Sequence, residues 1–119
     1  MTKTLCAIGF LLIATAAQSS DGGNSGTDVK SEIVARCKAQ MSEYGHVLVK
    51  SCIDQDITAL NEINSFMSLT KELPETDKTK SEYNAITSRC LEQMRSYGFA
   101  LVKSCIDQDV KAYKAIESY

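Results

Sequence analysis

Four cysteines are the residues of this 119-residue chain best suited to do chemistry. They form two pairs with the same spacing, Cys37 with Cys52 and Cys90 with Cys105, fifteen positions apart in each pair. A thiol redox centre uses Cys-x-x-Cys or a thiolate at a helix start, and a zinc site uses closely spaced cysteine pairs. Neither pattern is present. The fifth cysteine, Cys6, lies in the expected signal peptide. The even number that is left, in a small exported chain, is typical of structural disulfides, so we expect two bridges and no cofactor.

Carboxylates, one histidine and two methionines accompany the cysteines. Asp54 and Asp56 point about 200° apart on a helix, so they cannot chelate one metal together, and we expect a solvated or capping role. His46 is the only histidine. Met41 and Met94 share the cysteine face, and thioethers suit Cu(I), which keeps a metal or redox carrier as an alternative function. With no nucleophile elbow and no catalytic pair, we predict that the protein is not an enzyme.

The chain contains an internal repeat. Residues 33–60 align with residues 86–113 at a constant offset of 53 positions, and 17 of 28 positions are identical. Both copies contain the frame Cys-x3-Met-x2-Tyr-Gly-x2-Leu-Val-Lys-Ser-Cys-Ile-Asp-Gln-Asp. Residues 68–80, which include the only proline, Pro74, are expected to connect them. The repeat predicts the same local structure twice.

Apolar residues recur at helical spacing in each copy. Cys37, Met41, Tyr44, Leu48 and Cys52 fall within an arc of about 80° on a helical wheel. No proline interrupts either copy, and good helix formers are frequent. The sequence therefore predicts an all-α fold of amphipathic helices.

The disulfide pairing depends on whether each copy is one helix. Two cysteines fifteen residues apart on an unbroken helix are separated by about 22 Å. A disulfide tolerates only about 4.4 to 6.8 Å between Cα atoms. We therefore expect an antiparallel hairpin of two long helices with bridges between the copies, namely Cys37–Cys105 and Cys52–Cys90.

Gly45 and Gly98 allow a second arrangement. In the long hairpin they lie midway between the bridges and let the two helices approach closely. If each Tyr-Gly is instead a turn, each copy becomes a short disulfide-closed hairpin and the two pack as a four-helix bundle; bridging between molecules is a third possibility. The long hairpin leaves a second apolar face exposed as an interaction surface, formed by Val49, Ile53, Ile57, Leu60, Val102, Ile106, Val110 and Tyr113.

The N-terminal residues resemble an export signal. Lys3 precedes the short apolar run 5–14, and small residues follow, so we expect a signal peptide over 1–17 with cleavage after Ala16 or Ala17. Residues 18–28 are expected to be a disordered Gly/Ser-rich lead-in, and 29–119 the helical repeat domain. No second hydrophobic stretch follows, which predicts a periplasmic or secreted chain without a membrane span in its mature form.

The net charge limits the kinds of partner that the chain is expected to bind. The formal net charge is −2 and no basic cluster occurs, which argues against nucleic acid. We predict a non-enzymatic exported protein that binds a protein partner or self-associates. A metal or redox carrier and an exported effector or toxin-like protein are the alternatives.

Overall fold

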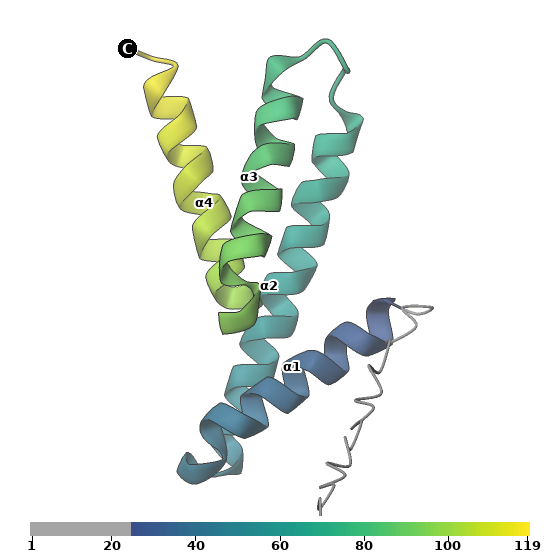
Figure 1. Ribbon diagram of the computed structural model, residues 1–119, viewed down its shortest axis with the longest axis vertical. Coiled ribbons are helices and arrows are strands. Elements are labelled where there is room, and N and C mark those ends of the chain that lie inside the picture. Colours follow the sequence, from purple (N-terminus) through teal and green to yellow (C-terminus); the bar gives the residue numbers. More distant parts are fainter. Residues whose placement is uncertain (1–24) are drawn as a thin grey trace, which may run out of the picture.

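The computed structural model describes residues 25–119, which are all-α as predicted (Figure 1). The expected signal peptide, residues 1–17, and residues 18–24 of the expected lead-in lie outside the described residues. Residues 25–28, also expected in the lead-in, already belong to the first helix. The elements are α1 (Ser25–Met41), η1 (Ser42–Tyr44), α2 (His46–Glu72), α3 (Lys78–Met94), η2 (Arg95–Tyr97) and α4 (Phe99–Ile116).

Each copy of the repeat is a helical hairpin and not one long helix. A single 3-10 turn ends the first helix, and the glycine after it reverses the chain, with φ of +97° at Gly45 and +118° at Gly98. Together with ψ of 167° and 157°, these dihedrals lie in a region that essentially only glycine occupies. The two glycines are therefore turn residues, and the expectation that they allow two long helices to approach is wrong.

The disulfides follow from these turns. Cys37 bonds to Cys52 and Cys90 to Cys105, with 5.7 Å between the Cα atoms in each case. Two disulfides form as predicted, but the preferred pairs, Cys37–Cys105 and Cys52–Cys90, are wrong. Because each glycine lies about midway between two cysteines, folding back at the glycine brings them level with each other. The second of the two expected arrangements, a pair of disulfide-closed hairpins, is the one that forms.

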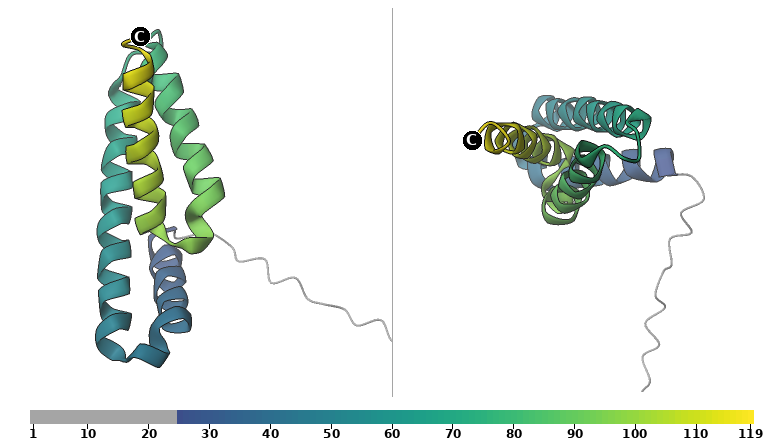
Figure 2. Two further views of the ribbon diagram at one scale, coloured as in Figure 1. Left: turned by 90° about the vertical axis from the view of Figure 1, so that its left-hand side faces the viewer. Right: turned by 90° about the horizontal axis from the view of Figure 1, so that it is seen from above.

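Helix α2 is shared between the two hairpins. Its 27 residues span about 40 Å. Helix α1 packs along its N-terminal part, while α3 and α4 lie beside its C-terminal part (Figure 2). The start of α4 thus lies beside α2 at Asp56, and the η2 turn before it lies near α1 (Figure 2). This places the first copy against the turn of the second.

The connection between the copies is shorter than expected and spans residues 73–77. Leu73 is extended, as the residue before a proline prefers to be. Asp77 then caps α3, because its side chain accepts a hydrogen bond from the amide of Thr79 at 2.9 Å. Pro74 thus lies in the loop before α3.

The predicted interaction face forms the core instead of an exposed surface. Val102 and Ile106 are buried, and the other members are buried or half-buried. The prediction is wrong because α2 packs against α4, which covers the apolar face that a two-helix hairpin leaves open. The buried cluster consists of Ile33, Cys37, Ala59, Ile63, Ile86, Cys90, Phe99, Val102 and Ile106.

Candidate functional site

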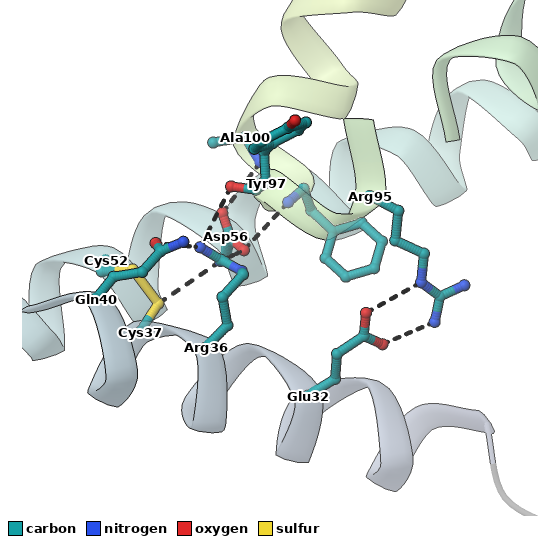
Figure 3. Close-up of polar contacts among 10 residues, drawn as sticks. Glu32, Arg36, Cys37, Gln40, Cys52, Asp56, Arg95, Tyr97 and Ala100 are labelled. Carbon is teal, nitrogen blue, oxygen red and sulfur yellow. Dashed lines mark hydrogen bonds and ion pairs between the residues drawn. A yellow bond between two sulfur atoms is a disulfide. The ribbon is translucent and has the colours of Figure 1, made fainter. Parts of the chain in front are cut away.

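The two copies meet at a buried carboxylate, Asp56 on α2 (Figure 3). Its Oδ2 accepts a hydrogen bond from the amide of Phe99 and its Oδ1 one from the amide of Ala100, both at 3.1 Å. These amides belong to the first turn of α4, whose N-cap residue, Gly98, has no side chain to satisfy them. Asp56 supplies the missing cap from another helix, and its negative charge suits the positive end of the α4 dipole.

Arg36 on α1 completes this arrangement. Its guanidinium forms an ion pair with Asp56 and also donates to the carbonyl oxygen of Tyr97 at 3.4 Å and to Oε1 of Gln40 at 3.0 Å (Figure 3). It lies so close to Gly98 that a Cβ there would be 2.8 Å from Cζ of Arg36. Gly98 is therefore required for its dihedrals, and a Cβ there would also displace the Arg36 guanidinium. The charge of the buried Asp56 is neutralised by Arg36 and by the helix end together.

A second ion pair lies at the edge of the junction. Arg95, on η2, donates to both carboxylate oxygens of Glu32 on α1, at 3.1 and 2.8 Å (Figure 3). Chiefly through this hydrogen bond, Arg95 lowers the pKa of Glu32 below its ordinary value, and Glu32 in turn raises the pKa of Arg95. The Arg95 guanidinium also lies 5.5 Å from the centre of the Phe99 ring. The ion pair holds the second copy's turn against α1, while the contact with Phe99 lies within the second copy.

Arg36 and Asp56, which contact the second copy's turn, have exposed counterparts in the second copy. Arg89 and Asp109 are the repeat equivalents of Arg36 and Asp56, and they also form an ion pair. Their side chains are 50% and 36% exposed, against 15% and 5% for Arg36 and Asp56. Within the described chain, Asp109 accepts no hydrogen bond from a helix N-terminus. The second copy therefore presents the same charged pair on an outer surface.

The turn also has an open counterpart, in the first copy. Gly45, His46 and Val47 are the repeat equivalents of Gly98, Phe99 and Ala100. In residues 25–119, no side chain accepts a hydrogen bond from the amides of His46 or Val47. A Cβ placed on Gly45 meets nothing within 4 Å, in contrast to Gly98. The N-terminus of α2 is therefore open where that of α4 is occupied.

Apolar side chains gather at the open turn. Tyr44 is 67% exposed, Val47 82% and Leu48 46%. Tyr44 and Leu48 belong to the face that carries the cysteines in a continuous helix, but the turn at Gly45 places them at the surface. Clustered exposed apolar residues are a feature of binding surfaces.

The other predicted site residues do not come together. Asp54 pairs with Lys50 on the surface at 2.5 Å, and Met41 and Met94 are half-buried in separate hairpins. No group of three His, Cys, Asp or Glu in residues 25–119 could hold a metal ion. In that same range, no helix is both long and apolar enough to cross a bilayer. The capping role expected for the acidic run is found at Asp56, although the helix it caps belongs to the other copy.

Sequence reasoning missed the junction itself. One signal lies directly after each glycine, where His46 and Val47 are replaced by Phe99 and Ala100 within segments 44–56 and 97–109 that are otherwise identical. Phe99 is buried while His46 is exposed. A change from a polar to an apolar residue at one position of a repeat indicates that only one copy is covered there.

Comparison with known proteins finds no match to a family model, to a curated protein or to a solved structure.

Proposed function

We propose that this protein is an exported, non-enzymatic, disulfide-stabilised helical module that works by binding another protein through the open turn of its first copy. The binding surface consists of Tyr44, Gly45, His46, Val47 and Leu48, and we call it the first turn. It replaces the interaction face expected from the sequence, which is largely buried.

The observation that carries the proposal is that apolar side chains are exposed at the first turn beside helix amides that no described side chain caps. Tyr44 and Leu48 are exposed to about the same extent as their equivalents Tyr97 and Leu101, at 62% and 49%, so Val47 and the uncapped amides distinguish the two turns. Val47 is the most exposed of these apolar side chains, at 82%. The matching turn of the second copy has its amides capped and Phe99 buried. The same backbone motif is therefore already docked on another part of this chain, which supports the use of the first turn as a docking element.

Export is supported by the N-terminal pattern and by the bridges. The sequence of residues 1–17 resembles a signal peptide, and disulfides persist in the periplasm or outside the cell. Both described cysteine pairs are disulfide-bonded. A metal or redox carrier would need free thiolates, so the bridges favour a structural role for the four cysteines.

Site-specific photo-crosslinking in the producing cells tests this function. A photoreactive phenylalanine analogue in place of Val47 is expected to form a covalent adduct with a protein that mass spectrometry identifies. The same analogue in place of Leu69, an exposed leucine near the end of α2, is the control. An adduct at position 47 and none at position 69 supports the proposal. No adduct at position 47, or equal adducts at both positions, overturns it.

A further inference from the structure

The contact between the two copies is asymmetric. The first copy contributes a charged face, made of Arg36, Asp56 and the apolar residues that follow on α2, and the second copy contributes its glycine turn. A contact between unlike surfaces of equivalent units leaves one surface of each kind unused at the ends of the array. Here the unused surfaces are the first turn and the charged face of the second copy.

Burial shows that the second copy's charged face is open along its length. We define this face by Arg89, Asp109, Ala112 and Ile116, the repeat equivalents of Arg36, Asp56, Ala59 and Ile63. Ile63 is 1% exposed at the junction, and Ile116 is 64% exposed. Ala59 is buried, and Ala112 is exposed. The second copy thus carries the residue types of a charged face with nothing covering them in the described chain.

We infer that the protein associates head to tail with a second copy of itself, with Arg89 and Asp109 of one molecule capping α2 of the next at Gly45, His46 and Val47. The contact repeats between molecules the one that already exists within the chain. This inference rests on the proposed function and names the partner of the first turn as this same protein.

The chemistry of the two free surfaces matches the chemistry of the junction. Asp109 supplies a carboxylate for the amides of His46 and Val47, as Asp56 does for Phe99 and Ala100. Arg89 keeps the position from which Arg36 packs on a glycine, and Gly45 leaves that space empty. The negative charge of Asp109 suits the positive end of α2.

Comparing the residues of the two free surfaces with those of the junction predicts that the contact between molecules is weaker than the contact within the chain. The Glu32–Arg95 ion pair has no equivalent, because the matching positions are Ala85 and Ser42. His46 replaces the buried Phe99, so less apolar surface is covered. We therefore expect reversible association that depends on protein concentration. Whether the assembly closes into a ring or continues as a chain depends on the rotation between successive molecules.

Sedimentation velocity of the oxidised protein, exported and purified with its bridges intact, tests the inference between about 1 μM and 1 mM, the range in which weak protein contacts dissociate. The average mass is expected to rise with concentration. Asp109→Ala removes the capping carboxylate and is expected to weaken association at least about tenfold. Asp107→Ala, which removes a neighbouring carboxylate that pairs only with Lys103, is the control and should leave association unchanged. A monomer at every concentration overturns the inference.

A mixing experiment separates head-to-tail association from a symmetric dimer. Val47→Asp places a carboxylate at the first turn that repels Asp109, while Asp109→Ala disables the opposite surface. Each variant alone is expected to associate at least about tenfold more weakly than the original protein, because one of its two surfaces is impaired. Their mixture is expected to give one species of dimer mass, since each partner still supplies one intact surface. A mixture that associates no more tightly than the separate variants overturns the inference, as does a variant that alone associates as tightly as the original protein. Circular dichroism confirms that both variants are folded.

A gain of affinity gives an independent check. The double substitution His46→Phe and Val47→Ala gives the first turn the residues that follow Gly98 in the second copy. This variant is expected to associate at least about tenfold more tightly, because a buried phenylalanine ring adds apolar contact. Unchanged or weaker association overturns the inference. An adduct at position 47 with a different protein would also overturn it, while leaving the proposed function standing.

Discussion

Asp56 caps the helix that begins at Phe99, 43 residues further along the chain, with its Oδ2 3.1 Å from the Phe99 amide nitrogen. The cap joins the two copies of the repeat, because Asp56 lies in the first and Phe99 in the second. Its repeat equivalent, Asp109, forms the same ion pair with arginine and caps no described helix. Two aspartates in the same local sequence thus have different roles, so the same substitution at each position gives a matched comparison.

Asp56→Ala is expected to lower the free energy of unfolding by about 3–5 kcal/mol. The substitution leaves the partly buried Arg36 guanidinium without its partner and two helix amides without an acceptor. Asp109→Ala is expected to lower it by about 0–1 kcal/mol, since its ion pair is exposed to solvent. Urea unfolding followed by circular dichroism measures both, at a protein concentration low enough to keep the chain monomeric. Equal losses for the two variants would contradict the assigned cap.

Gly98→Ala is expected to destabilise the protein more than Gly45→Ala. Both substitutions impose a strained backbone worth about 1–3 kcal/mol, because both glycines have positive φ. At position 98 the new methyl group also displaces the Arg36 guanidinium and weakens its ion pair with Asp56. Thermal and urea unfolding of the two variants give the comparison. A larger loss of stability for Gly45→Ala than for Gly98→Ala would contradict the close contact between Gly98 and Arg36.

Cleavage of the connection tests the disulfide pairing directly. Glu75 lies in the exposed loop at residues 73–77, so limited proteolysis of the unreduced protein with a glutamate-specific protease should cut there first. After denaturation without reductant, the two halves are expected to separate, because each disulfide lies within one half. Mass spectrometry identifies the products. Halves that stay joined until reductant is added would show bridges between the copies.

Glu32 is expected to make the stability sensitive to acid. Arg95 lowers the pKa of Glu32 below its ordinary value of 4.5, so the folded state favours the ionised carboxylate. The resulting stabilisation is fully present above the ordinary pKa and is lost as pH falls through the lowered pKa of the folded state. Because the pair is partly exposed, we expect at most about 1 kcal/mol.

The variant Glu32→Gln isolates this contribution. The difference in free energy of unfolding between the original protein and the variant should be constant near neutral pH and shrink toward zero below the ordinary pKa. Urea titrations at a series of pH values measure it. A difference that grows on acidification would show that the charged pair does not stabilise the fold.

Local patterns in the sequence were enough to predict the all-α class, the presence of two disulfides and the equivalence of the copies. Apolar spacing of 3.6 residues identifies helices because it depends only on near neighbours. Even so, the helical stripe of the first copy continues in phase from Met41 through Gly45 to Leu48, so spacing alone gave no sign of the turn. Taking Gly45 as a helix interior residue then led to the wrong disulfide pairs and to an interaction face that is in fact buried.

By itself, the sequence determined that the chain is all-α and that the two copies share one local structure, because these depend on residues close together in the chain. Only the tertiary structure decided that Gly45 and Gly98 are turns, that each disulfide closes its own copy, and that Asp56 is buried while Asp109 is exposed. The physical reason is that these properties depend on contacts between α1, α2 and α4. Two equivalent segments have different environments because the charged face of the first copy packs against the second copy, while the matching face of the second copy stays exposed.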